Sequence, residues 1–127
     1  MLAYLTADYD PKCLTNVRGE TAVKNTIKFT NTSYLYDDLS DNLKYNLQNG
    51  QGILYFNHAL ALRTSYFYGS SSLRAFWKMT SSSNSPFNEE FASTLEAIDY
   101  PIYAVQPHPE KNLFEWKVNA VRSDLGA

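Results

Sequence analysis

The pattern of apolar and polar residues divides the chain into short extended segments around one longer helical segment. Apolar and polar residues alternate through CLTNVRG, residues 13–19, and through TAVKNTIKFT, residues 21–30, with β-branched residues at many positions. Alternation with a period of two is typical of half-buried strands. We therefore predict two strands of an open or half-covered sheet in the first 30 residues.

The period changes in SYLYDDLSDNLKYNLQNG, residues 33–50. A leucine recurs every four residues, at Leu35, Leu39, Leu43 and Leu47. This spacing places the leucines on one face of a helix, and Asn49-Gly50 supplies a C-terminal stop. The pattern predicts a helix across this segment with its leucine stripe in the core.

The middle of the chain combines a short strand with irregular segments. GILYFN, residues 52–57, predicts a buried strand whose end brings Asn57 and His58 to the edge of a sheet. TSYFYGSSS, residues 64–72, has no clean period and predicts a loop. SLRAFW, residues 72–77, is compatible with one or two helical turns capped by Ser72.

The last third predicts a loop followed by two strands. TSSSNSP, residues 80–86, is rich in serine and is interpreted as an ordinary loop. FASTLEAI, residues 91–98, and YPIYAV, residues 100–105, predict strands joined by a tight connection at Asp99. The complete order of strands, helix, strand, loop and strands favours an α/β or α+β layered domain over a helical bundle.

Composition limits the classes of function. The chain has 127 residues, 44% of them apolar, which suits one domain, and a net charge of −2 without a basic stripe, so we expect no nucleic-acid binding. No apolar run approaches the roughly 20 residues of a membrane span, and the first ten residues do not read as a signal peptide. Cys13 is the single cysteine, and the two histidines are distant in sequence, so neither a disulfide nor a metal site is expected.

The candidate chemistry lies in QPHPEK, residues 106–111. Side chains at positions i and i+2 of an extended segment point to the same side, so His108 and Glu110 can face one another across Pro109. A carboxylate that accepts the proton of one imidazole nitrogen leaves the other nitrogen to act as a base toward a nucleophile. Pro107 and Pro109 restrict the backbone and end the strand. On spacing alone, a solvated surface pair remains the alternative.

A longer match supports the catalytic interpretation. YPIYAVQPHPEKNLFEW, residues 100–116, resembles the end of the catalytic domain of gamma-glutamyl hydrolases, members of the class I glutamine amidotransferase-like group. YFNHALAL, residues 55–62, resembles the family's Phe-Asn-His segment, and FASTLEAIDYP, residues 91–101, resembles its Phe-(Ile/Val)-Ser-Thr-(Met/Val)-Glu strand. The similarity is strong from Tyr55 to Trp116 and weak before Gly50.

This resemblance implies a fold, a reaction and roles for four residues. The implied fold is the C-terminal part of a flavodoxin-like three-layer α/β domain with a mixed β-sheet. His108 would be the catalytic histidine, Glu110 the carboxylate behind it, and Asn57 and His58 would lie beside the substrate. A cysteine thiolate would cleave γ-glutamyl bonds of folyl-poly-γ-glutamates without a metal or organic cofactor. The family also implies a lysosomal, vacuolar or extracellular location.

The chain departs from the family at the nucleophile. The family's cysteine lies in an elbow of the form Gly-x-Cys-x-Gly, upstream of the matched region, whereas Cys13 stands between Lys12 and Leu14. Pro107 replaces the family's Trp. We therefore interpret residues 1–127 as one partial domain that lacks the N-terminal half, and we expect Cys13 not to be the nucleophile and the chain alone to be inactive.

Two hypotheses follow from this departure. In the first, the chain is an incomplete hydrolase that needs an N-terminal half, or another copy of itself, as a partner. In the second, it is a non-catalytic relative, a pseudoenzyme that serves as a binding or assembly module.

Overall fold

A four-stranded antiparallel sheet forms the centre of the molecule in a computed structural model that describes residues 1–50 and 53–111. Its strands lie in the order β3-β6-β7-β8: β3 (Lys28–Phe29), β6 (Trp77–Asn84), β7 (Glu90–Ala97) and β8 (Tyr103–Val105). Two further pairs join β1 (Thr15–Asn16) to β5 (Leu60–Ala61) and β2 (Val23–Asn25) to β4 (Leu54–Phe56).

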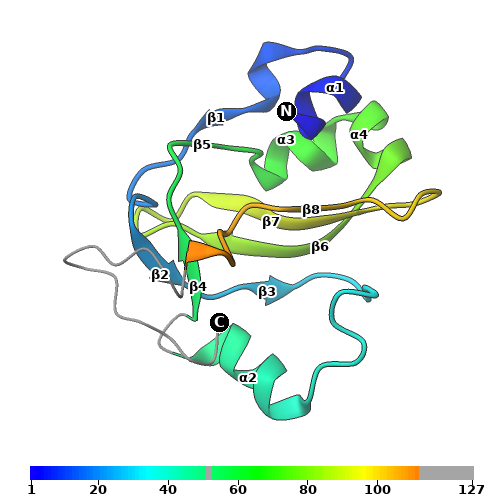
Figure 1. The fold of residues 1–127 in the computed structure, drawn as a ribbon. Helices are drawn as coiled ribbons and strands as arrows, with labels where there is room; N and C mark the ends of the chain where they lie inside the picture. Colours follow the sequence, from blue (N-terminus) through cyan, green and yellow to red (C-terminus); the bar gives the residue numbers. More distant parts are fainter. Residues whose placement is uncertain (51–52, 112–127) are drawn as a thin grey trace.

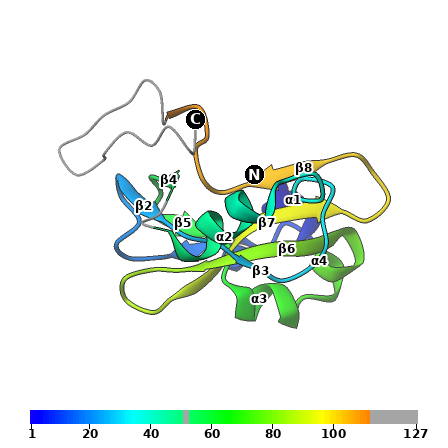
Figure 2. The same cartoon turned by 90° about the horizontal axis from the view of Figure 1, so that it is seen from below.

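Helices lie on both sides of the sheet (Figure 1). The short helices α1 (Leu2–Thr6), α3 (Thr64–Gly69) and α4 (Ser71–Phe76) cover one side, together with the 3₁₀ turn η1 (Pro11–Cys13). Helix α2 (Asp41–Asn49) lies on the opposite side, beyond β3 (Figure 2). The described residues thus form an α/β arrangement with small sheets. The prediction of a mixed sheet is wrong for these residues, because every described strand pair is antiparallel.

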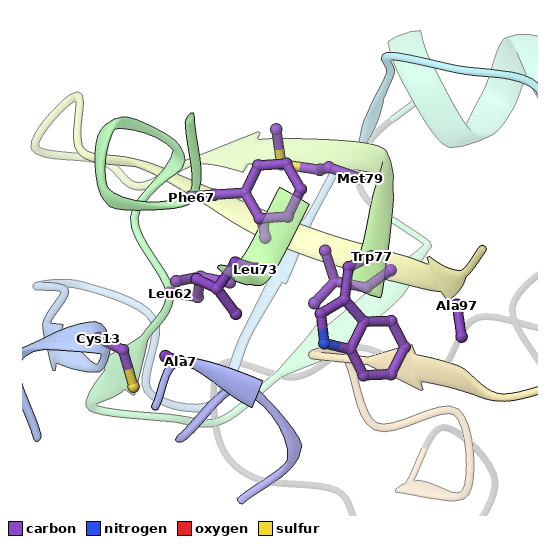
Figure 3. Packing of buried hydrophobic residues seen from close by; sticks show 10 residues of the cluster. Ala7, Cys13, Leu62, Phe67, Leu73, Trp77, Met79 and Ala97 are labelled. Atoms are coloured by element: carbon purple, nitrogen blue, oxygen red, sulfur yellow. The ribbon is translucent and has the colours of Figure 1, made fainter. Parts of the chain in front are cut away.

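Two apolar clusters build the core. The cluster on the side of α1, α3 and α4 is shown in Figure 3 and includes Cys13, Leu73, Trp77 and Met79, all buried. The indole N–H of Trp77 donates to the Oγ1 atom of Thr6, which fastens α1 to the sheet. Fully burying side chains of this size stabilises a fold by roughly 1.5–3 kcal/mol each. The second cluster lies toward α2 and contains Val17, Ile27, Leu47, Ile53, Phe56, Ala61 and Phe91.

The first 30 residues form three short strands rather than the two predicted. Gly19 has a positive φ of 86° and Ala22 one of 53°, which interrupts extended backbone between β1 and β2. The side-chain oxygen of Asn25 then accepts a hydrogen bond from the N–H of Thr26, ending β2 before β3 begins. Such local side-chain bonds compete with strand pairing.

The predicted helix of residues 33–50 is shorter than expected. It begins after Ser40, whose hydroxyl accepts from the N–H of Leu43, and it ends before Gly50 as predicted. The hydroxyl of Ser33 instead accepts from the N–H of Leu35, which holds the preceding segment in a turn. Consequently Leu35 is exposed, whereas Leu39, Leu43 and Leu47 pack into the core.

Two segments predicted as loops are regular structure. Residues 64–69 form α3, and the cap of α4 is Ser70 rather than Ser72. Residues 80–84 continue β6, although their serines favour a loop. Here the buried hydroxyls pair across the strands: Ser83 contacts Ser93 at 2.6 Å and Ser81 contacts Thr94 at 2.6 Å. Satisfied hydroxyls lower the cost of burying serine, so tertiary pairing overrides the local preference.

Three predicted strands are confirmed. β4 lies within residues 52–57, β7 nearly fills residues 91–98, and β8 follows a tight connection through Asp99. Gly52, and the matched residues Glu115 and Trp116, lie outside the described residues. Among the helices described, none combines the length and apolar character that crossing a membrane requires.

Candidate functional site

The His-Pro-Glu corner is fastened to two strands by main-chain hydrogen bonds. The N–H of Gln106 donates to the oxygen of Ser93 on β7 at 2.8 Å, and the N–H of His108 donates to the oxygen of Tyr55 on β4 at 2.8 Å. Pro107 between them is buried. The backbone position of His108 is therefore set by both the central sheet and the β2-β4 pair.

The two predicted catalytic side chains contact each other. Nδ1 of His108 lies 2.9 Å from Oε1 of Glu110, with side-chain exposures of 35% and 64%. A main-chain hydrogen bond, and after it the imidazole of His108, lower the pKa of Glu110 below its usual value, so its carboxylate is ionised at neutral pH. An ionised acceptor favours the proton on Nδ1 and leaves Nε2 of His108 as the basic nitrogen.

Asn57 and His58 follow β4 and lie at the same end of the molecule as His108. The imidazole of His58 packs against the rings of Phe91, at 5.0 Å between centroids, and Phe56, at 5.8 Å. Burial, and after it the positive charge that His108 can carry, lower the pKa of His58 to about 4. His58 is therefore neutral at physiological pH and lies within electrostatic range of His108.

The side chains of Asn57 and His58 differ in their hydrogen bonding. The side-chain oxygen of Asn57 accepts a hydrogen bond from the N–H of Ala22 at 3.2 Å. Both ring nitrogens of His58 are buried and have no hydrogen-bond partner within residues 1–50 and 53–111. Buried polar atoms are usually satisfied, so the His58 ring offers one donor and one acceptor to a bound group or to water.

Glu20 is a buried ionisable residue that the sequence did not indicate. Its side chain is fully buried, and its main-chain oxygen accepts from the N–H of His58 at 2.9 Å. Burial raises the pKa of its carboxyl group to about 7, although a hydrogen bond from Asn25 opposes the shift. A Gly-Glu pair between two short strands is typical of an exposed turn, so no local signal could have found it.

Cys13 lies among apolar residues on the side of the sheet that α1, α3 and α4 cover (Figure 3). It is 1% exposed. Burial, and after it the negative charge of Asp10, raise the pKa of its thiol. A reactive cysteine needs an accessible thiolate, and this environment opposes both requirements.

The described residues contain no group of three or more His, Cys, Asp or Glu side chains arranged to hold a metal ion.

The His-Pro-Glu corner provides an imidazole base with an ionised carboxylate on its Nδ1 side. Such a pair accepts a proton from a nucleophile and returns it to a leaving group.

Comparisons with known proteins agree with the resemblance seen in the sequence. No family model matches the chain. A gamma-glutamyl hydrolase of Rattus norvegicus is 31% identical over 116 residues, which cover 91% of this chain and 36% of the relative. Gamma-glutamyl hydrolases of Mus musculus and Dictyostelium discoideum are 40% and 37% identical over 60 residues, which cover 47% of this chain and 19% and 17% of the relatives. By sequence, the chain is related to the gamma-glutamyl hydrolases, and it spans about a third or less of the length of these relatives.

Proposed function

We propose that this chain is the C-terminal part of a gamma-glutamyl hydrolase-like domain and supplies the His-Glu pair of a Cys-His-Glu site. The observation that carries the proposal is the 2.9 Å contact between His108 and Glu110 within a segment that resembles the family. The attacking thiol belongs to polypeptide outside this chain, because Cys13 is buried and its thiol pKa is raised. The substrate class is γ-glutamyl amides such as folyl-poly-γ-glutamates.

The proposed chemistry divides the work between the thiol and the corner. Nε2 of His108 takes the thiol proton, and the sulfur attacks the carbonyl carbon of the γ-glutamyl amide. The C–N bond breaks as the imidazolium returns the proton to the departing amine, and water then hydrolyses the thioester. Glu110 holds the ring orientation and stabilises the imidazolium. Neutral His58, whose ring nitrogens have no hydrogen-bond partner among the described residues, borders the substrate and orients it with Asn57.

The outer strand β8 supports a need for further polypeptide. It leads directly into the His-Glu corner and pairs only with β7 among the strands described. Tyr103 and Val105 on this strand are 39% and 51% exposed. An exposed apolar edge of this kind is a template for strand pairing. A neighbouring strand from the cysteine-bearing polypeptide would cover the edge and bring the thiol toward His108.

A chimera tests the proposal directly. This chain would replace the matching region of the rat gamma-glutamyl hydrolase, which supplies the remaining polypeptide. We expect the chimera to release glutamate from a folyl-poly-γ-glutamate, as detected by mass spectrometry. His108→Ala should abolish this release, and Cys13→Ala should preserve it. A folded chimera whose activity survives His108→Ala would contradict the proposed base.

The isolated chain provides the second arm. Because no accessible thiol is supplied, we expect glutamate release at background level. Release that disappears in Cys13→Ala would instead make Cys13 the nucleophile and refute the assignment of the thiol to other polypeptide.

The non-catalytic alternative is based on the missing glycine-flanked cysteine and on Pro107, which stands where the family has Trp. It predicts that the isolated chain is a monodisperse monomer that binds folyl-poly-γ-glutamate in calorimetry, and that the folded chimera releases no glutamate. A chain that folds only beside other family polypeptide would favour the incomplete hydrolase.

A further inference from the structure

Glu20 is buried although it carries an ionisable carboxyl group. It lies between β1 and β2 and is fully buried. The neighbouring Gly19 is covered by the turn that follows β6, because a Cβ atom added at Gly19 would lie 3.0 Å from Cδ of Pro86. The segment carrying Glu20 is therefore enclosed by the β6-β7 connection.

The hydrogen bonds of the Glu20 carboxyl group are incomplete. Oε1 accepts from the side-chain N–H of Asn25 at 3.0 Å, and the same nitrogen donates to the main-chain oxygen of Asn84 at 2.9 Å. Oε2 is buried and has no hydrogen-bond partner in the part of the chain that the structure describes. A buried carboxylate with one hydrogen bond is strongly disfavoured, so the geometry favours the neutral acid.

Within residues 1–50 and 53–111, no charged side chain is among the causes that shift the pKa of Glu20. The causes of its raised pKa are burial, which dominates, and the opposing bond from Asn25. Among the charged residues on the adjoining segments, Glu89 accepts from the N–H of Arg18 and pairs with the guanidinium of Arg63 at 3.0 Å. His58, which bonds to the Glu20 main chain, is neutral because its own pKa is lowered.

The Glu20 segment also positions the residues predicted to lie beside the substrate. The main-chain oxygen of Glu20 accepts a hydrogen bond from the N–H of His58 at 2.9 Å, and the N–H of Ala22 donates one to the side-chain oxygen of Asn57 at 3.2 Å. A change in the placement of residues 20–22 therefore reaches both Asn57 and His58. Through Asn25, the same segment is linked to the end of β6.

We infer that Glu20 is a protonation-dependent positioning residue. Its neutral form holds residues 20–25 against Asn84 and thereby places Asn57 and His58. Its ionisation loosens that segment. This inference concerns the fold around the site and stands whether or not the chain takes part in hydrolysis.

The direction of the pH effect follows from linkage. The pKa of Glu20 rises from 4.5 in the unfolded chain to about 7 in the folded one. Between these values the folded state binds more protons, so its stability falls as pH rises and levels off above about pH 7. His58 acts in the opposite sense between about pH 4 and 6.5, so only a comparison with a Glu20 variant isolates the effect.

Urea unfolding from pH 5 to 8.5 tests the inference in three proteins. Glu20→Gln mimics the neutral acid, and Asp99→Asn makes the same chemical change at an exposed site. Relative to the parent, the folding equilibrium constant of Glu20→Gln should rise on the order of a hundredfold between pH 5 and 8. Asp99→Asn should follow the parent. Parallel curves for Glu20→Gln and the parent would overturn the inference.

Nuclear magnetic resonance separates positioning from simple stability, and its first readout needs only the parent protein. In the parent, one glutamate carboxyl carbon should titrate near pH 7, and the amide signals of Asn57 and His58 should shift with the same midpoint. In Glu20→Gln both changes should vanish. If every glutamate titrates below pH 6, or if the two amides do not follow the carboxyl group, Glu20 does not position them.

Discussion

The main-chain N–H of His108 donates a hydrogen bond of 2.8 Å to the main-chain oxygen of Tyr55. This bond joins the corner after β8 to β4, the strand that Asn57 and His58 follow. It explains how two segments that are separate in sequence, the His-Pro-Glu corner and the Asn-His pair, come to share one end of the fold. The electrostatic effect of His108 on His58 is a consequence of that arrangement.

Replacing Glu110 should change the tautomer of His108 with little effect on stability. In Glu110→Gln the ionised acceptor on the Nδ1 side is lost, so the proton should redistribute between the two ring nitrogens. Because the pair is largely exposed, the free energy of unfolding should change by less than about 1 kcal/mol. Long-range proton-nitrogen spectra of the imidazole, with His58 as the internal reference, measure the tautomer. An unchanged proton distribution would show that Glu110 does not orient the ring.

His58 should make the protein less stable in acid. Its pKa is about 4 in the folded chain and 6.5 in the unfolded one, so the unfolded state binds more protons between these values. Stability contributed by neutral His58 is therefore complete above about pH 6.5 and is lost as pH falls toward 4, by about 1–2 kcal/mol after allowance for partial solvent access.

Urea unfolding with and without His58→Phe measures this loss of stability in acid. Both proteins should carry Glu20→Gln, which removes the opposite pH dependence that Glu20 contributes. The phenylalanine variant should lack the loss of stability between pH 6.5 and 4. A direct imidazole titration of His58 with a midpoint near 6.5 would contradict the burial effect.

Cys13 should react slowly with thiol reagents in the folded protein. Its side chain is 1% exposed and the pKa of its thiol is raised, so both access and thiolate formation are limited. Modification by a chromogenic disulfide at pH 8 should be at least about tenfold slower than in the urea-unfolded chain. Equal rates in both states would mean that the thiol is accessible.

Two glycines should respond oppositely to alanine. At Gly19 a φ of 86° is combined with a contact of 3.0 Å from the added Cβ to Cδ of Pro86, so Gly19→Ala should cost roughly 1–2 kcal/mol or more. At Gly69, in α3, the added methyl group meets nothing within 4 Å, and alanine should be neutral or stabilise by up to about 1 kcal/mol. Thermal unfolding of both variants provides the comparison, and an unaffected Gly19→Ala would contradict the enclosed turn.

Local patterns in the sequence were sufficient for several elements. The apolar run ending at Phe56 and the β-branched and aromatic residues of FASTLEAI predicted β4 and β7, and the Asn49-Gly50 stop predicted the end of α2. The contact between His108 and Glu110 was also predictable, because it depends on residues two positions apart in extended backbone.

Other features depend on contacts between distant residues. The serines of β6 form a strand because the hydroxyls of Ser83 and Ser81 pair with those of Ser93 and Thr94 on β7. Leu35 lies outside the helix because its N–H donates to the hydroxyl of Ser33, which itself donates to the carboxylate of Glu96. The partners on β7, Ser93, Thr94 and Glu96, cannot be read from the local segment.

The sequence by itself determined the family relationship, the short strands with strong apolar patterns and the pairing of His108 with Glu110, because these follow from residues that are neighbours along the chain. Only the tertiary structure decided that His58 is neutral, that Glu20 is buried beside it and that the thiol of Cys13 is covered. Burial sets the protonation of such groups, and burial is a property of the segments that pack over a residue rather than of its neighbours in sequence.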